Sequence, residues 1–532
     1  MSPSFEKKRS PMDPKRDLSA GLVVFLVALP LCLGIAVASG APPLAGLMAG
    51  IIGGIVVSLI SGASLAVSGP AAGLTVIVLN GIDDLGGYEV FVSAVLAAGL
   101  IQILLGFLGA GLIGYFFPNA VIKGMLAGIG AILILKQLPH LFGHDKDPEG
   151  DVAFQQQDGK NTFTELWDAI QDPEPTAILI GLVGLAVLIF WPKIPGLGKQ
   201  KILPAPLVVV GLGVVIHEII KSVRPEWTLE ASHMVQIPVA SFTDSLANTL
   251  PHPQIEHFER YDVWKTGVVV AMIASIETLL CIEAIDRLDP EKRHTPLNRE
   301  LKAQGIGNAI AGFLGALPLT AVIVRGSANV QAGGRTRWSA FAHGVMLLIA
   351  VGFLAAQMNL IPLAALAAVL LHVGYKLASV GLFKEMASRG TGQMLPFVVT
   401  VAAILLTDLL TGVGIGLLVG LGFLVKETTR QGIAIEDLSE DESHPSHMRI
   451  NLGPQVTFLH KAAIRNALRS VPDGVRVDVV GGGANSVDPD VHELLEDAVE
   501  IQKSRGVEVV LMDVPKPRAR LLEQPEQATV AE

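Results

Sequence analysis

Two residues with ionisable side chains lie within apolar stretches of the sequence. Glu277 occurs in SIETLLCIE and Arg325 in VIVRGSANV. Because a charged group is costly in the hydrocarbon of a bilayer, such residues are expected to face a partner or a watery cavity. A buried carboxylate is protonated, paired with a group such as Arg325, or bound to a cation. Thr278 and Cys281, beside Glu277 and one helical turn beyond it, add polar atoms. These side chains predict an ion-handling site.

Two related segments interrupt the apolar tracts on either side of this site. ASLAVSGPAAGLTVIV covers residues 63–78, and LTAVIVRGSANVQAGG covers residues 319–334. Each is typical of a short β-rich stretch followed by a small-residue turn and the start of a helix. A broken backbone at membrane depth requires protein or a water-filled cavity around it, and two breaks in matching places indicate a transporter's binding site. The alternative is ordinary small-residue packing between helices.

The composition indicates the class of protein that holds these segments. Of the 532 residues, 51% are hydrophobic and 17% charged, with a mean hydropathy of +0.53, as in polytopic helical membrane proteins. The net charge of −10 argues against a nucleic-acid partner. The two cysteines, Cys32 and Cys281, offer neither a disulfide framework nor a zinc site. Without a nucleophile–base pair, metal cluster or phosphate loop in the sequence, we do not expect an enzyme.

Apolar windows of about 20 residues predict the membrane spans. Twelve candidates lie near residues 18–38, 43–61, 90–110, 116–138, 175–191, 204–221, 263–285, 301–316, 339–356, 361–379, 393–409 and 411–427. Two interrupted helices, near 69–82 and 326–334, raise the count to fourteen. We therefore predict an all-α polytopic membrane protein with fourteen transmembrane segments.

The spans divide into two halves of seven, related by an offset of about 246 residues. Asp17 opens the first span as Asp262 opens the eighth. Because seven is odd, repeats at about 18–221 and 263–427 are inverted relative to each other in the membrane. By this offset the apolar Leu31 in the first half is the counterpart of Glu277 in the second. Clusters of Lys and Arg fall on one side of this arrangement, which predicts that both termini lie in the cytoplasm.

The ends of the chain differ from the membrane part. Residues 1–17 are polar and basic and form a cytoplasmic segment ahead of a transport domain at 18–430, with no cleavable signal peptide evident. Residues 431–447 read as an acidic linker. From 448 to 514 the pattern is β-α-β-α-β, which predicts a small α/β domain, and 515–532 is a disordered tail.

Several of these segments together resemble a known family. DLSAGLVVFLVALPLCLGIA, SLAVSGPAAGLTVIV and GIGNAIAGFLGALPLTAVIVRGSANVQAGGRT occur in an order that resembles the SulP (sulfate permease) family of inorganic anion transporters, bacterial relatives of pendrin and prestin. The ETLL sequence is similar to the branch of bicarbonate and sulfate carriers. The resemblance implies a core domain (spans 1–4 and 8–11), a gate domain (spans 5–7 and 12–14), a cytoplasmic STAS domain, a homodimer, and alternating access of core against gate.

The resemblance also implies where the anion binds. It sits between the facing N-termini of the third and tenth half helices, bordered by spans one and eight. Helix N-termini suit anions because their N–H groups are unpaired and the helix dipole is positive there, and small residues let an anion approach the backbone. Arg325, immediately before the second half helix, adds positive potential or, alternatively, snorkels to water. The expected anion-binding residues are Gly69, Pro70, Ala71, Ala72, Arg325, Gly326, Ser327 and Ala328, with Leu31 and Cys32 at the border.

Coupling is the remaining expectation drawn from the family. The resemblance suggests that Na⁺ binds at Glu277 with Thr278 and Cys281; proton coupling by Glu277 and a structural Glu277–Arg325 pair are the alternatives. Many bacterial relatives place a glutamate after the proline of the first span, but Leu31 follows Pro30 here. We thus expect a secondary transporter of bicarbonate, with possible Na⁺ as coupling ion and no other cofactor. Sulfate or dicarboxylate transport, and a STAS-linked membrane anion sensor, are the alternatives.

Overall fold

The computed structural model describes residues 13–145, 154, 159–193, 204–237, 250–431, 433–438 and 447–515. The chain forms two compact units, residues 1–417 and 418–532. Residues 1–12, most of the predicted linker and the predicted tail from residue 516 lie outside the described residues.

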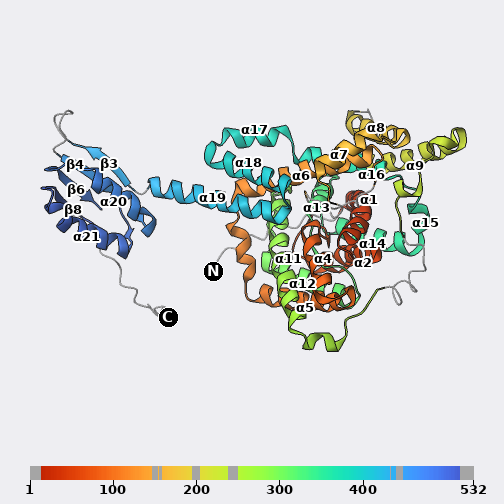
Figure 1. The fold of residues 1–532 in the computed structure, drawn as a ribbon, viewed down its shortest axis with the longest axis horizontal. Helices are drawn as coiled ribbons and strands as arrows, with labels where there is room; N and C mark the ends of the chain where they lie inside the picture. The colour runs from red at the N-terminus through yellow and green to blue at the C-terminus, as the bar shows by residue number, and fades with distance from the viewer. Residues whose placement is uncertain are drawn as a thin grey trace, which may run out of the picture. The chain divides into compact units, whose positions relative to one another are not determined.

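The fourteen predicted spans all correspond to elements of the described chain (Figure 1). Among the described residues, nine helices are long and apolar enough to cross a membrane. Two shorter apolar helices, the more polar α12 and two broken segments complete the set. The long spans are α1 (Pro14–Ala38), α2 (Pro43–Ile52) with its extension through η1 (Gly53–Val57) and α3 (Ser58–Ile60), α5 (Tyr88–Phe107), α6 (Asn119–Leu141), α8 (Pro175–Phe190) with η4 (Trp191–Lys193), α9 (Ala205–Val223), α11 (Tyr261–Leu288), α16 (Leu363–Leu377) with α17 (Val380–Ser388), and α19 (Leu409–Gln431); the others are α12 (Leu297–Phe313), α14 (Trp338–Phe353) and α18 (Thr391–Leu406).

The two broken segments meet at their strands. The first consists of β1 (Ser68–Pro70), η2 (Ala72–Leu74) and α4 (Thr75–Leu85), and the second of β2 (Leu319–Ala321) and α13 (Ile323–Gln331). β1 pairs antiparallel with β2, with Ser68 opposite Ala321 and Pro70 opposite Leu319. Two equivalent strands related by a two-fold axis across them must run antiparallel. The pairing therefore agrees with the predicted inverted repeat.

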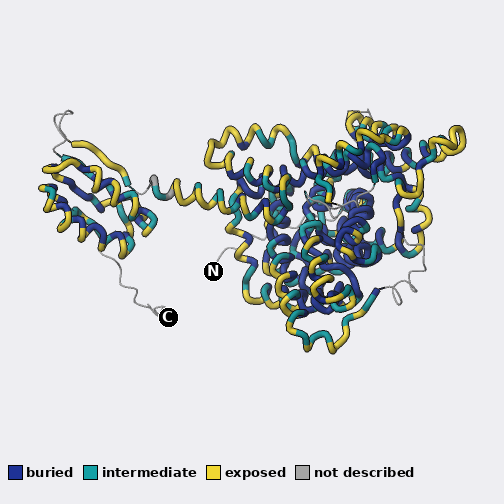
Figure 2. Tube along the Cα trace, in the orientation of Figure 1, coloured by how far each residue is buried: buried dark blue, intermediate teal, exposed yellow. Residues whose placement is uncertain are grey.

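Helix packing separates the predicted core from the predicted gate. α1 packs against α2 and α14, and α5 packs against α11 and α12; α6 packs against α16 and α18, and α8 against α9 and α16. Within the core the backbones of α5 and α12 lie very close, since a Cβ at Gly99 would stand 2.2 Å from the Ala309 nitrogen. Such small-residue contacts are characteristic of membrane helices. Figure 2 shows α1 and α2 buried along almost their whole length.

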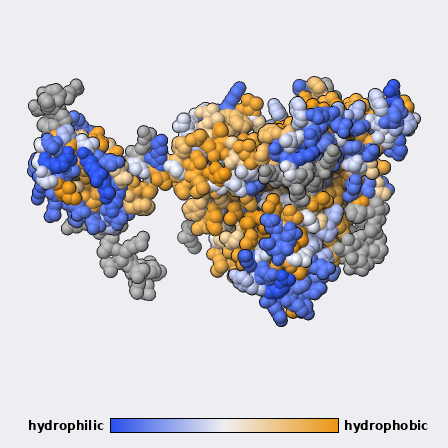
Figure 3. Space-filling view, in the orientation of Figure 1, coloured by the Kyte–Doolittle hydropathy of each residue, from blue (hydrophilic) through white to orange (hydrophobic). Residues whose placement is uncertain are grey.

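The surface of the first unit is apolar where a bilayer would contact it. Figure 3 shows hydrophobic side chains over much of its visible face. Leu104 and Phe107 on α5, for example, are 56% and 72% exposed. Exposed apolar surface on this scale indicates lipid contact. The shorter described helices are α7 (Thr162–Gln171), α15 (Ala355–Met358), η3 (Ala110–Phe116), η5 (Pro225–Trp227), η6 (Ala231–His233) and η7 (Ile255–Glu259).

The segment around η6 is joined to the ends of two gate helices. The Val235 N–H donates to the Ile361 carbonyl at 3.0 Å. Asp145, just past α6, lies 2.5 Å from Nδ1 of His140 and 2.6 Å from Nδ1 of His233. Burial acts to raise the pKa of Asp145, but the hydrogen bonds from the two histidines outweigh it and lower that pKa. The pKa of His233 is raised, chiefly by its hydrogen bond to Asp145.

The second unit contains a small α/β domain. A four-stranded sheet has the order β3-β4-β6-β8, in which β3 is antiparallel and the others are parallel. The elements are β3 (Ile433–Asp437), β4 (His447–Leu452), β5 (Gln455–Val456), η8 (Phe458–His460), α20 (Lys461–Ser470), β6 (Arg476–Val480), β7 (Ser486–Val487), α21 (Pro489–Lys503) and β8 (Glu508–Met512). One prediction is corrected here. Residues 433–437, which were assigned to the linker, form a strand that pairs with β4, because the apolar Ile433 and Ile435 recur at the two-residue period of a strand.

Candidate anion-binding site

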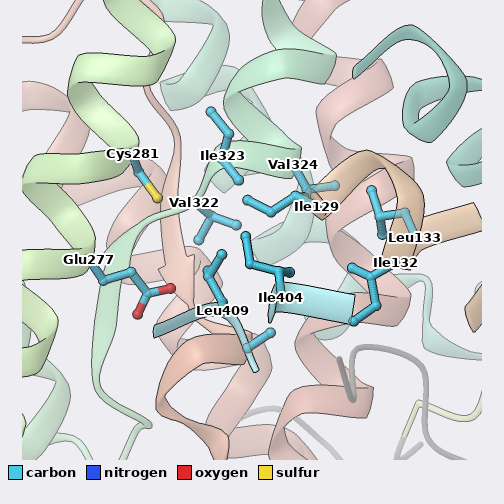
Figure 4. A pocket seen from close by; sticks show the side chains of 11 residues that line it. Ile129, Ile132, Leu133, Glu277, Cys281, Val322, Ile323, Val324, Ile404 and Leu409 are labelled. Atoms are coloured by element: carbon cyan, nitrogen blue, oxygen red, sulfur yellow. The ribbon is translucent and has the colours of Figure 1, made fainter. Parts of the chain in front are cut away.

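A small cavity lies between the core and the gate, with a volume of about 50 Å³. Its gate wall is entirely aliphatic, whereas its core wall includes the two polar side chains of Glu277 and Cys281 (Figure 4). The lining residues are Ile129, Ile132, Leu133, Ile404 and Leu409 from the gate, and Ala72, Glu277, Cys281, Val322, Ile323 and Val324 from the core. Both half helices therefore reach the cavity at or beside their first residues.

Glu277 lies on α11 with its carboxylate against the start of the first half helix. The carboxylate lies directly against Gly73 of η2: a Cβ there would stand 3.0 Å from Oε1 and 3.1 Å from Oε2, so a larger residue would push the carboxylate aside. Glu277 is 4% exposed, and its Oε2 has no hydrogen-bond partner among the described residues. The carboxylate thus has one free acceptor inside the cavity.

Two further side chains of α11 contact the second broken segment. Cys281 lines the cavity together with Ile323, the first residue of α13. The Thr278 hydroxyl accepts from the Ala321 N–H of β2 at 3.4 Å. Of the predicted cation-coupling residues, Glu277 and Cys281 therefore line the cavity, whereas Thr278 contacts β2 and is absent from the lining.

The half helices begin at other residues than the sequence indicated. α13 begins at Ile323, three residues earlier than expected, so Arg325 lies in its first turn instead of preceding it. On the other side, Gly69 and Pro70 belong to β1 and Ala71 precedes η2, which begins at Ala72. The residues of the two segments that line the cavity are Ala72 of the first and Val322, Ile323 and Val324 of the second.

The small residues of α13 pack inside the core. A Cβ at Gly326 would stand 2.4 Å from Cδ1 of Ile285 on α11. The Ser327 hydroxyl donates to the Val324 carbonyl of its own helix at 2.9 Å, and Ala328 is 1% exposed. Gly326, Ser327 and Ala328 are absent from the cavity lining. Their small size serves close helix packing here.

Arg325 is completely buried and points away from Glu277. Its Nη2 donates to Sγ of Cys32 at 3.2 Å, and its Nη1 lies against Gly69, where a Cβ would stand 1.9 Å away. The ion pairs among the described residues include no contact between Glu277 and Arg325, so the alternative of a structural pair is not supported. Leu31 is 5% exposed and belongs to the same apolar cluster as Cys281. Neither Cys32 nor Leu31 is among the residues that line the cavity, so their place at the border of the anion site stays a prediction.

A polar row on α12, which the sequence interpretation missed, holds both strands. Asn308 donates to the Leu319 carbonyl at 2.9 Å and accepts from the Leu319 N–H at 2.7 Å. Gln304 donates to the Ser68 hydroxyl at 2.7 Å and to Glu300 at 2.9 Å. The spacing of four between Glu300, Gln304 and Asn308 in an otherwise apolar span was the available signal.

A second, larger cavity of about 690 Å³ lies farther along α6 and α11. Its walls carry charges of both signs, with basic residues in excess. They include Lys123, Arg287, Lys292, Lys376, Arg389, Glu283, Asp286 and Glu385. On the gate wall Lys123 pairs with Glu385 at 2.6 Å, and on the core wall Arg287 pairs with Glu283 at 2.7 Å. The cavity is a basic vestibule between core and gate.

Residues 15–400 match the family described as the sulfate permease family. The chain belongs to the sulfate permease family. This match covers most of the first unit and confirms the family resemblance and the fold expected from it. The protein is accordingly an anion transporter of this family and a polytopic membrane protein.

Individual members of the sulfate permease family show the same relationship. The putative sulfate transporter YvdB of Bacillus subtilis is 28% identical over 441 residues, covering 81% of this chain and 76% of that protein. The bicarbonate transporter BicA of Synechocystis is 29% identical over 409 residues, covering 76% and 68%. The solved transmembrane domain of a cyanobacterial BicA matches with a TM-score of 0.54 at 26% identity, over 77% of this chain and 97% of that one. Murine solute carrier 26 member A9 matches in fold alone, with a TM-score of 0.65 at 16% identity, over 96% and 91%.

Proposed function

We propose that the protein is a secondary transporter that carries bicarbonate with Na⁺ across the bacterial cytoplasmic membrane by alternating access. The observation that carries this proposal is the placement of one buried carboxylate, Glu277, in a small cavity where two half helices begin. The half helices would bind the anion, and Glu277 with Thr278 would bind the cation. We further propose that both termini are cytoplasmic, that the α/β domain is a STAS domain, and that the protein is a homodimer.

Charge balance favours a monovalent anion at this site. Each helix start carries the equivalent of about half a positive charge, so two starts provide about one. A sodium ion bound at Glu277 would cancel the carboxylate charge. One bicarbonate would then leave the site close to neutral, whereas sulfate would leave about one negative charge without compensation in a cavity of low dielectric. The relatives named as bicarbonate transporters support the same choice.

The basic vestibule supports the direction of access. It lies at the C-terminal end of α11, which the predicted topology places in the cytoplasm. A cleft with excess positive charge raises the local concentration of anions. We infer that the vestibule leads from the cytoplasm toward the anion site, and that closure of core against gate at this end would accompany opening at the other.

Uptake by purified protein in liposomes tests the proposal. Radiolabelled bicarbonate should accumulate when an inward Na⁺ gradient is imposed, should not respond to a proton gradient alone, and should be little inhibited by excess sulfate. Glu277→Gln should remove the stimulation by Na⁺, while Glu256→Gln, the same change on the exposed η7, should not. Sulfate uptake that exceeds bicarbonate uptake would establish the sulfate alternative and overturn the choice of substrate. Anion binding without any flux would instead indicate a sensor.

A further inference from the structure

We propose that Glu277 is an internal competitor of the transported anion: in the state described here its carboxylate takes the place of an anion at the start of the first half helix. The inference rests on the proposed function, because it takes this cavity to be the anion site. It adds that a cation promotes anion binding by removing a competing negative charge.

The contacts of Glu277 are those expected of an anion bound at a helix start. The backbone N–H groups in the first turn of a helix lack partners within the helix and donate to anions. Gly73 lies in η2, which leads directly into the eleven residues of α4, and the Glu277 carboxylate lies against it, about 3 Å from the place of a Cβ. The carboxylate therefore occupies the space beside this helix start that an incoming anion would need.

A second, independent observation points to a ligand at this place. Glu277 is 4% exposed, and its Oε2 has no partner among the described residues although it faces the cavity. A buried acceptor without a partner is costly. The free oxygen therefore marks a position for a proton or a metal cation.

The start of the second half helix lies beside another side chain of the same helix. Cys281 is one turn after Glu277 and lines the cavity together with Ile323, the first residue of α13. Glu277 and Cys281 thus cover one helix start each, but only the Glu277 carboxylate carries a full charge in its ionised form. Competition with an anion is therefore expected from Glu277 far more than from the thiol.

The expected strength of the competition follows from Coulomb's law. Two unit negative charges about 4 Å apart at an effective dielectric constant of about 20 repel strongly enough to reduce binding roughly 1000-fold. Hydration and rearrangement of the carboxylate will reduce this factor, so we expect at least a tenfold effect. Neutralisation of Glu277 by Na⁺ or a proton removes the repulsion, and by linkage the anion must then strengthen cation binding by the same factor.

The decisive variant is Glu277→Gln, which keeps the shape of the side chain and removes its charge. If Glu277 is an internal competitor, the variant binds the anion in Na⁺-free buffer at least tenfold tighter than the wild type does, and Na⁺ changes its affinity less than threefold. If Glu277 is only a ligand for the cation, the variant in every buffer binds as weakly as the Na⁺-free wild type.

The measurement is equilibrium binding of radiolabelled bicarbonate to the full chain in detergent, with and without Na⁺ at one pH. Glu256→Gln is the matched control and should behave as the wild type. Glu277→Ala provides a second variant with neither charge nor carbonyl acceptor, and it should also bind tighter without Na⁺. Tight Na⁺-free binding by either folded variant supports the inference, and weak binding by both overturns it. Failure of the wild type to transport bicarbonate would overturn the proposed function, a separate result.

Discussion

Asn308 on α12 offers a direct test of how the second half helix is positioned. Its side chain makes three hydrogen bonds: two to the backbone of Leu319 in β2 and one, at 2.6 Å, to Gln102. Asn308 and Leu319 are both 0% exposed. Replacing Asn308 by Ala removes all three bonds and leaves the N–H and C=O of Leu319 without this partner.

The size of the effect depends on whether those backbone groups find new partners. Hydrogen bonds between membrane helices contribute on average only about 0.6 kcal/mol, because alternatives exist. A buried polar group left unsatisfied costs about 1–3 kcal/mol. β2 lies between β1, α11 and α12, where water does not reach it. The N–H and C=O of Leu319 would therefore both stay unsatisfied in the variant. We expect Asn308→Ala to lower the free energy of unfolding by about 2–4 kcal/mol.

Reversible unfolding in mixed detergent measures this difference. Asn298→Ala is the matched control, since Asn298 lies on the same helix and accepts one hydrogen bond, from the Gly111 N–H at 2.9 Å. It should lose no more than about 1.5 kcal/mol. Equal losses in the two variants would refute the role assigned to Asn308. The anion affinity should fall only in Asn308→Ala, because β2 leads directly into the start of α13.

Three other predictions concern separate parts of the first unit. Gly326→Ala should cost about 1–3 kcal/mol through overpacking against Cδ1 of Ile285, and Ile285→Val in the same chain, which removes that methyl group, should recover part of the loss in the unfolding midpoint. The pKa of His233 is raised by its contact with Asp145. The stabilising effect of this contact is therefore fully present below a pH of about 6.5 and is lost as the pH rises through the raised pKa. In a series of thermal-unfolding measurements from pH 5 to 9, His233→Gln should remove this dependence on pH. Asp17→Ala should cost about 2–4 kcal/mol because three hydrogen bonds just before α14 disappear, whereas Asp17→Asn, which keeps an acceptor, should cost less in the same assay.

Hydropathy was sufficient to predict twelve of the fourteen spans, because lipid demands apolar residues wherever a helix crosses it. The repeat and the two breaks followed from internal similarity. The helix starts were harder to place. Small residues such as Gly326 were read as the anion contact, but in the structure they allow close packing, and Ile323 begins the helix. A sequence shows which residues are small, but only the packing shows what approaches them.

The sequence also did not predict in which direction the buried side chains point. A pair between Glu277 and Arg325 was one of the alternatives for the buried carboxylate, because both are ionisable and lie near the breaks. In the structure Arg325 turns toward Cys32 while Glu277 turns toward Gly73. The rotation of each helix about its own axis decides in which direction its side chains point. Hydropathy does not report this rotation when every side of the helix is buried in protein.

The short β1–β2 pairing has a mechanical consequence for the transport cycle. Because hydrogen bonds tie the two half helices together, neither can tilt without the other, and the core must turn as one rigid piece. Rotation is then confined to the three connections that leave the core: those between α5 and α6, between α9 and α11, and between α14 and α16. In the first of these, Gly109 adopts a φ of 83°, a left-handed conformation open mainly to glycine. In the proposed transport cycle the hinges would therefore lie at the periphery of the core and not at the half helices themselves.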